Sequence, residues 1–431
     1  MNTITSMCVL LLFASAVAGE SHYVDSNNRN ANDSGPGTLK IPWKSLSAVN
    51  RYSFKPGDFV HFARGSSYTG GFIVKDSGTT SQPITFTSYG TGPAPSFSNS
   101  DYAILNGNVI QVRGAYIVID GLYFHDGAQS PSPEKEQVLK VGDVYVVKGA
   151  DHAIIRNCEV KNSPLGFHIN GQFCQVTRNQ LHDCNRFLAG TGWGPIAIMI
   201  SNANTEISYN RIMNYLAIGG KYGADGGALE IDPRIYGDII HDVRIHHNYS
   251  YGNEGFLEVA EAKDSISVRY NVSNDYQEFV ILYEGSNCLF ENNTVLRVLP
   301  KNSVTDVVFT FHQSGSIIRN NIFVVNSGRK VFSANGTEVW GRTNYAGQTH
   351  DHNIYFSLDG SQSDPCGLPL GPGDKIADPR FVDYAKQDLH LKPDSPAIES
   401  GFDIGRALDA DGTPVPQGKA PDIGAYEFGH N

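Results

Sequence analysis

The chain has little charge and no clustered positive charge. Only 18% of its 431 residues are Asp, Glu, Lys or Arg, and the formal net charge is −11. Phosphate contacts need clustered Lys and Arg, and the sequence contains no basic run, so we expect no nucleic-acid partner and no binding to anionic membranes. A strongly anionic polysaccharide is a less natural ligand for the same reason.

Metal-binding cysteine patterns and long apolar runs are also missing. Apart from Cys8, the chain has five Cys, with no CxxC or Cys/His spacing, so no zinc site is predicted. The sequence leaves their pairing open between disulfides and buried thiols. After residue 19 there is no stretch of ~20 consecutive apolar residues, which argues against a membrane span.

The first nineteen residues, MNTITSMCVLLLFASAVAG, have an apolar run followed by Ala-Val-Ala. This pattern is typical of a secretory signal peptide, here cleaved near Gly19 or Glu20, and predicts a secreted, extracellular protein. In a eukaryotic secretory pathway, glycan acceptors would be the N-x-S/T sequons. They begin at Asn32, Asn248, Asn271, Asn292 and Asn335.

Short β-branched runs recur along the chain, and each ends near an asparagine. No segment shows a 3.6-residue apolar period over a dozen residues, so helices are expected to be scarce. The successive intervals between the asparagines are 22, 31, 38, 23, 22 and 28 residues, which indicates a period near 22 with insertions in some units. The aligned asparagines are Asn157, Asn179, Asn210, Asn248, Asn271, Asn293 and Asn321.

This repeat predicts an all-β fold, a right-handed parallel β-helix whose equivalent positions lie ~4.8 Å apart in neighbouring coils. Asparagine suits the bends because it tolerates left-handed backbone geometry and can stack in a ladder. We expect a signal peptide over 1–19, the β-helix with a short N-terminal capping helix over 20–360, and a tail packed on its outside over 361–431.

The stretch ALEID places two acids on the outer face of one strand. Alternate residues of a strand point the same way, so Glu230 and Asp232 share one face while Leu229 and Ile231 point to the core. Discounting a five-residue insertion, Glu258 takes the position of Glu230 in the next coil. Carboxyl groups ~5 Å apart raise each other's proton affinity, so one can remain protonated as a general acid beside an ionised partner.

That division of labour is the chemistry of glycoside hydrolysis. A gap of ~5 Å favours retention through a carboxylate nucleophile, and ~6.5 to 9.5 Å favours inversion through an activated water. The segments DGGALEID and IHHNYSYGNEGFLE resemble the corresponding coils of β-helix glycoside hydrolases of the β-xylosidase and xylanase/fucosidase type. The resemblance implies a catalytic pair of Asp232 with either Glu254 or Glu258, acting on a polysaccharide or oligosaccharide.

Further residues are expected to line the same face. One predicted column lies nine residues before the unit asparagine and consists of Lys148, Asn170, Ser201, Glu284 and His312. His168 lies two residues before Asn170 and should point the same way. Stacking surfaces and rim groups on inserted loops are predicted at Lys221, Tyr222, Asp225, Trp193, Arg234, Tyr236 and Tyr283.

Three other interpretations stay open. The first is a polysaccharide lyase or uronan epimerase, with Lys221, His168, Arg234 or His312 as base and neutraliser. The second is calcium bound by carboxylates, with Asp225, Glu230, Asp232 and Glu261 as candidates. The third is a non-catalytic glycan-binding or structural rod. The glycosidase requires no cofactor, and we expect a monomer.

Overall fold

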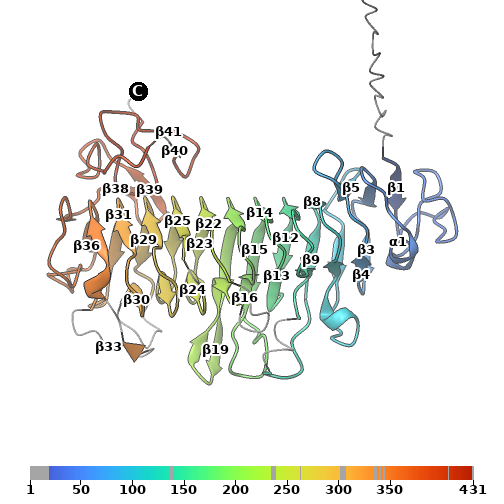
Figure 1. Ribbon diagram of the computed structural model, residues 1–431, viewed down its shortest axis with the longest axis horizontal. Helices are drawn as coiled ribbons and strands as arrows, with labels where there is room; N and C mark the ends of the chain where they lie inside the picture. The colour runs from blue at the N-terminus through green and yellow to red at the C-terminus, as the bar shows by residue number, and fades with distance from the viewer. Residues whose placement is uncertain are drawn as a thin grey trace, which may run out of the picture.

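Each coil of the chain contributes one strand to each of three parallel sheets, which stack along a single rod (Figure 1). The structure is a computed structural model. It describes residues 19–134, 140–233, 239–262, 264–300, 307–333, 337–338, 341–342, 345–405 and 407–429. Residues 1–18 of the expected signal segment fall outside these residues, as do Arg234, Tyr236 and Asn335, so the predictions made for them remain predictions. The predicted parallel β-helix is confirmed.

The chain passes through the sheets in a fixed order that we call C, A and B. Sheet C has nine strands. They are β4 (Phe72–Val74), β7 (Ile110–Val112), β10 (Val144–Val146), β13 (Leu165–Ile169), β16 (Ile196–Ile200), β21 (Gly227–Ile231), β24 (Leu257–Val259), β27 (Val280–Leu282) and β30 (Phe309–Phe311).

Sheet A has twelve strands. They are β1 (Ser21–Val24), β2 (Phe59–Ala63), β5 (Ile84–Tyr89), β8 (Ile117–Asp120), β11 (Ile154–Arg156), β14 (Gln175–Thr177), β17 (Glu206–Ser208), β22 (Val243–His246), β25 (Ile266–Arg269), β28 (Leu289–Glu291), β31 (Ile317–Arg319) and β35 (Thr349–Asp351).

Sheet B also has twelve. They are β3 (Ser67–Thr69), β6 (Ser96–Ser98), β9 (Tyr123–His125), β12 (Glu159–Lys161), β15 (Gln180–Cys184), β18 (Arg211–Tyr215), β23 (Tyr249–Tyr251), β26 (Val272–Asn274), β29 (Thr294–Arg297), β32 (Ile322–Val325), β36 (Ile354–Ser357) and β37 (Lys375–Ile376).

Four antiparallel hairpins interrupt the coils or follow them. They pair β19 (Ala217–Gly220) with β20 (Gly223–Asp225), β33 (Thr337–Glu338) with β34 (Gly341–Arg342), β38 (Phe381–Asp383) with β39 (Asp388–Leu391), and β40 (Ala407–Leu408) with β41 (Pro414–Val415). The β19–β20 hairpin lies between sheets B and C and protrudes from the side of the rod (Figure 1).

The interior of the rod is apolar because the inward positions of most strands carry branched or aromatic residues. In β21, Leu229 and Ile231 are 2% and 0% exposed and join the main core cluster, as their alternation predicts. Each such side chain contributes about 1.5–3 kcal/mol when fully buried. Stacked coils therefore supply the hydrophobic burial that no single coil has.

A buried asparagine ladder runs between sheets A and B. The backbone N–H of each member donates to the side-chain oxygen of the next, as from Asn179 to Asn210 at 3.0 Å. The ladder continues through Asn248, Asn271, Asn293, Asn321 and Asn353 and ends on the carboxylate of Asp374.

The alignment of Asn157 with this ladder is wrong by one residue. The member in that coil is Cys158, whose N–H donates to the Asn179 side-chain oxygen at 2.9 Å. Asn157 instead takes the left-handed position just before it, with φ of 54°. Asparagine favours both positions, one for its αL backbone and the other for its amide, so a count based on asparagine alone confuses them.

The two ends of the rod are closed differently. At the N-terminal end, α1 (Leu46–Arg51) begins after Ser45, whose hydroxyl accepts the N–H of Ser47, and it buries Leu46 and Val49 in the core. In the rest of the described chain the only helical segments are short 3₁₀ turns over Leu105–Gly107 and Tyr345–Gly347.

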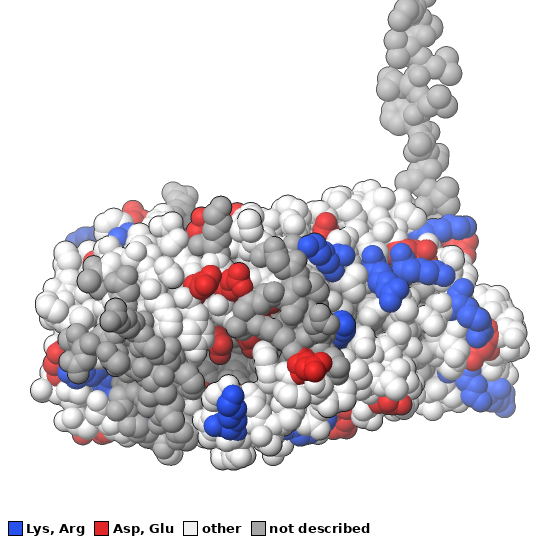
Figure 2. Space-filling view, turned by 60° about the horizontal axis from the view of Figure 1, so that its bottom comes forward, with Lys and Arg blue, Asp and Glu red and all other residues white. Residues whose placement is uncertain are grey.

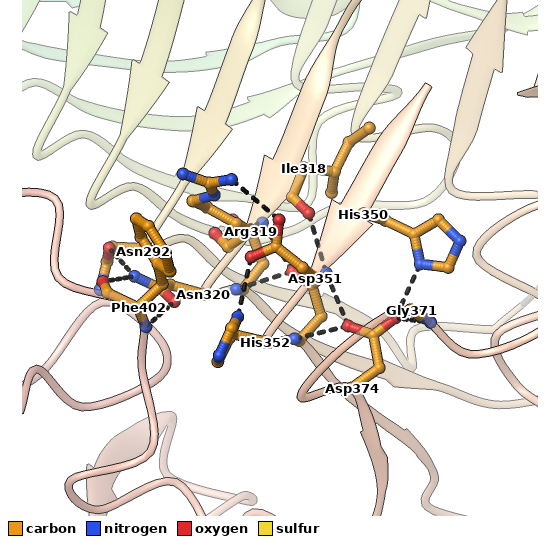
Figure 3. Close-up of polar contacts among 12 residues, drawn as sticks. Asn292, Ile318, Arg319, Asn320, His350, Asp351, His352, Gly371, Asp374 and Phe402 are labelled. Carbon is orange, nitrogen blue, oxygen red and sulfur yellow. Dashed lines mark hydrogen bonds and ion pairs between the residues drawn. The ribbon is translucent and has the colours of Figure 1, made fainter. Parts of the chain in front are cut away.

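At the other end, polar contacts join the last coils to the C-terminal segment (Figure 3). Asn320 donates to the Phe402 carbonyl at 2.8 Å and accepts its N–H at 2.7 Å. Asp374 accepts from the backbone N–H of Asn353 and lies 2.7 Å from the His350 ring nitrogen. A second apolar cluster, including Phe381 and Leu391, packs this segment on the outside of sheet B.

All five described cysteines are buried and free, namely Cys158, Cys174, Cys184, Cys288 and Cys366. Of the two arrangements left open by the sequence, the structure shows buried thiols. No helix among the described residues is long and apolar enough to cross a membrane.

Candidate active site

The turns that lead from sheet B into sheet C are lengthened in the middle of the rod and surround a cavity. One wall includes Trp193 and Tyr222, from the loop before β16 and from the β19–β20 hairpin, and the floor is formed by β21 and β24. The cavity has a volume of about 440 Å³, within the usual range of ligand sites. Figure 2 shows this side of the molecule, with acidic side chains gathered around a hollow.

Five carboxylates line the cavity, and none of the described lining residues is Lys, Arg or His. A site of this kind has a negative potential and disfavours an anionic ligand. The five are Asp225, Glu230, Glu254, Glu258 and Glu278.

Glu230 and Glu258 lie on the cavity floor, on neighbouring parallel strands. The strand register pairs them directly, as the interval count predicts. Parallel neighbours are spaced ~4.8 Å, so the two side chains leave the sheet side by side. Glu230 is 7% exposed, and Glu258 is half-buried.

Glu254 lies in the turn before β24. Its side chain is 4% exposed, and neither carboxyl oxygen has a hydrogen-bond partner among the described residues. Burial raises the pKa of Glu254 to about 8, and the negative charges of Glu278, Asp225 and Asp275 add to the effect. A carboxyl group in this state keeps its proton near neutral pH and can donate it.

Asp225 lines the cavity at the end of the β19–β20 hairpin, in the turn before β21. Its two oxygens accept the backbone N–H groups of Gly194 at 2.8 Å and Gly226 at 2.9 Å. Burial raises the pKa of Asp225, while these two hydrogen bonds act in the opposite direction. The side chain also joins two lengthened turns, which supports the cavity wall.

Glu278 is a member of the site that the sequence reasoning missed. It is 2% exposed and lies in the turn before β27. The strand register aligns it with Gly255, so no repeated acid marks its position. The sequence feature that could have identified Glu278 is the similarity of two short segments. Glu-Gly-Phe precedes β24, and Gln-Glu-Phe precedes β27.

The column predicted through Lys148 and Glu284 is partly wrong. The backbone N–H groups of Asn170, Ser201 and His312 donate to equivalent positions of the preceding strands, so these three residues do share a column. The members in the other coils are Val147, Asp232, Ala260 and Tyr283. Lys148 and Glu284 each lie one position later and are exposed. The Glu284 coil has one extra residue before its ladder asparagine. The Lys148 coil has two extra residues before Cys158, and counting from Asn157 compensates for only one of them.

Asp232 and His168 are fully buried and do not line the cavity. The His168 ring lies 2.9 Å from the Ser201 hydroxyl and stacks on Tyr145 at 4.7 Å. Burial lowers the pKa of His168 to about 3, so the ring is neutral. Asn170 is buried as well. The roles proposed for these three residues remain predictions.

The predicted aromatic residues divide between the cavity and its rim. Trp193, Tyr222 and Tyr283 line the cavity. Lys221 is exposed beside the rim, with its ammonium 5.0 Å from the centroid of the Tyr222 ring. His312 meets the edge of Tyr283 at 5.1 Å and does not line the cavity.

The four carboxylates considered for calcium are not gathered in one place. Among the described residues, no group of three or more His, Cys, Asp or Glu is arranged to hold a metal ion. Asp225 and Glu230 line the main cavity, whereas Glu261 lines a second, more open one of about 430 Å³ together with Glu284. The arrangement of the acids therefore gives no support to the calcium interpretation.

Comparison with known proteins agrees with this architecture. Residues 137–295 match the family model of the right handed beta helix region. No curated protein matches the sequence. The chain resembles the solved structure of pectate lyase Pel9A, with a TM-score of 0.58 and 16% identity over 96% of this chain and 97% of that one.

Two other solved structures are similar at comparable levels. XylC, solved with xylose, has a TM-score of 0.52 and 11% identity over 94% of this chain and 98% of that one. GH136 lacto-N-biosidase from Eubacterium ramulus has a TM-score of 0.50 and 14% identity over 78% and 67%. At such identities the likeness shows the fold alone, and it confirms a right-handed parallel β-helix.

Proposed function

We propose that the protein is a secreted glycoside hydrolase that acts on an uncharged polysaccharide or oligosaccharide. The observation that carries the proposal is the buried carboxyl of Glu254, which has no hydrogen-bond partner in the described part of the chain and lies in the same cavity as Glu230 and Glu258. A protonated acid near an ionised carboxylate is the pairing that glycosidic hydrolysis needs. The carbohydrate-active enzymes among the similar structures support the substrate class.

In the proposed reaction, Glu254 gives its proton to the glycosidic oxygen as the bond from that oxygen to the anomeric carbon breaks. Glu230 or Glu258, as carboxylate, either bonds to the anomeric carbon or takes a proton from the water that attacks it. In the first case a water later cleaves the sugar–enzyme ester and returns a proton to Glu254. The sugar rings would stack on Trp193 or Tyr222 at the cavity wall.

A polysaccharide lyase or uronan epimerase is the second candidate, and it is favoured by the pectate lyase among the similar structures. Such an enzyme must neutralise the carboxylate of a uronate while a base removes the neighbouring proton. The acidic lining of the cavity counts against that substrate. A purely structural rod is disfavoured because the lengthened turns form a cavity at the acidic coils.

The test is turnover of a panel of neutral and acidic glycans. The hydrolase predicts new reducing ends from a neutral glycan without an ultraviolet-absorbing product, and loss of this activity in Glu254→Gln. Glu284→Gln, the same change in the second cavity, is the control and should remain active. Release of ultraviolet-absorbing unsaturated uronates from pectin or alginate would show that the protein is a lyase and not a hydrolase.

A further inference from the structure

The turn between β26 and β27 forms one buried edge of the cavity. Gln277 aligns with Glu254 of the preceding coil, and its backbone N–H donates to the Glu254 carbonyl at 2.7 Å. Glu278 follows directly and lines the same cavity as Glu254. Two almost fully buried acids, on adjacent coils, therefore share this edge.

Arg297, at the end of β29, lies beneath this turn with no exposed surface. Its Nε donates to the Gln277 carbonyl, and its Nη2 donates to the Glu278 carbonyl at 2.9 Å. Its Nη1 reaches the Ser273 hydroxyl at 3.1 Å. The guanidinium thus fixes the backbone of both cavity-lining residues and places a positive charge behind them.

The nearby Asp275 has its own polar partners. One oxygen accepts the hydroxyls of Ser250 and Ser273 at 2.7 and 2.6 Å, and the other accepts the backbone and side-chain N–H groups of Asn253. These four hydrogen bonds hold the carboxylate of Asp275 in place. Asn253 is also the neighbour of Glu254, so the same network holds both acidic turns.

We propose that Glu278 is a positioning residue for the hydrolase: its carboxylate, kept ionised by Arg297 beneath it, holds the proton on Glu254. The inference rests on the proposed function for its catalytic meaning. It explains why an arginine is buried beneath this turn: the positive charge stabilises an anion that water cannot reach.

The groups that face Glu254 come from every turn around it. Glu278 and Asp275 lie in the following turn, and Asp225 lies on the hairpin. Glu230 and Glu258 line the floor of the same cavity. Burial is the largest cause of the raised pKa of Glu254, and Glu278 is the largest of the charges that raise it further.

The experiment is Glu278→Gln, which removes the charge and retains the shape. The readouts are the pH titration of the Glu254 carboxyl carbon by NMR, identified by its loss in Glu254→Gln, and the alkaline limb of kcat/KM. We expect both midpoints to fall from about 8 by about one pH unit, as for removal of one nearby like charge. Asp225→Asn should lower them less, and Glu284→Gln should not move them.

Glu278→Met, of similar volume, gives a second uncharged replacement if the first does not fold, and Glu278→Asp should restore the midpoint toward wild type. An unchanged Glu254 midpoint in a folded, uncharged variant would overturn the inference. A lowered NMR midpoint in a protein that hydrolyses no glycan would support the inference and refute the proposed function, so the two failures are distinguishable.

Discussion

Glu230 lies directly opposite Glu258 on the neighbouring parallel strand, at the centre of the cavity floor. Both leave the outer face of sheet C, while the leucines next to them in the chain, Leu229 and Leu257, point into the core. Like charges in such a pair are destabilising unless a proton, a cation or a ligand compensates them. A chemical role for the pair can be tested by replacing each carboxylate in turn.

Replacing either member of this pair should reduce hydrolysis far more than binding. Glu230→Gln and Glu258→Gln keep the shape of the floor but remove the carboxylate, and we expect the essential one to lower kcat by about 10²–10⁴-fold with little change in KM. The separation between Glu254 and the essential floor carboxylate sets the anomeric outcome: ~5 Å gives retention through a nucleophile, and ~6.5 to 9.5 Å gives inversion through an activated water. Proton NMR of the first-formed product decides this. A product of inverted configuration would show that the floor carboxylate acts as a base and not as a nucleophile.

The asparagine ladder should contribute measurably to stability. Asn248 donates to the Ile207 carbonyl at 2.9 Å and accepts the backbone N–H of Asn210 at 3.0 Å. Asn248→Ala leaves these buried groups unpaired, at a cost of about 1–3 kcal/mol for each. Denaturant unfolding measures the loss, with exposed Asn30→Ala as the control. Equal stability of the two variants would contradict the structural role of the ladder.

The sequence predicts the ladder and the Glu230–Glu258 register for the same physical reason. Stacked coils repeat one backbone path, so intervals along the chain become positions in space. Positions inferred from these intervals are wrong in coils that contain extra residues or lack the ladder asparagine. The coil of Lys148 has Cys158 in place of the ladder asparagine and two extra residues before it, so counting from Asn157 misplaces the column by one position.

Turn residues follow no such repeat, and this is why Glu278 was not found. Its equivalent in the preceding coil is Gly255, and its importance depends on the buried Arg297 beneath it. A charged residue at a position where the strand pattern predicts a core residue is a usable signal: Arg297 follows Val295 and Leu296 at the end of β29. A buried cation needs nearby polar groups or anions, and these lie at the cavity wall.

We expect glycans only at sequons whose asparagine side chain is exposed, and not at every sequon in the sequence. The amide groups of Asn248, Asn271 and Asn292 are buried and bonded to backbone carbonyls, and only Asn32 among the described sequons is exposed. In a eukaryotic secretory host we expect a glycan at Asn32 and none at the three buried sites. Peptide mass mapping tests this, with Asn32→Gln as the control. A glycan on Asn271 of the folded protein would contradict the ladder.

Asp143 should make the protein less stable as the pH rises toward neutrality. It is 1% exposed, and burial raises its pKa to about 7. A carboxyl whose pKa is higher in the folded than in the unfolded state contributes fully below the unfolded value near 4, and this contribution is lost as pH rises through 7. The loss at pH 8 is a few kcal/mol.

Asp143→Asn removes this titration while keeping the volume of the side chain. We expect the variant and the wild type to unfold at similar denaturant concentrations at pH 4, and the variant to be more stable at pH 8 by a few kcal/mol. Glu427, whose pKa burial raises to about 7, still titrates in the variant, so its stability keeps a weaker dependence on pH. Parallel stability curves for the two proteins between pH 4 and 8 would show that Asp143 is ionised in the folded state throughout, and that its charge is compensated inside the rod.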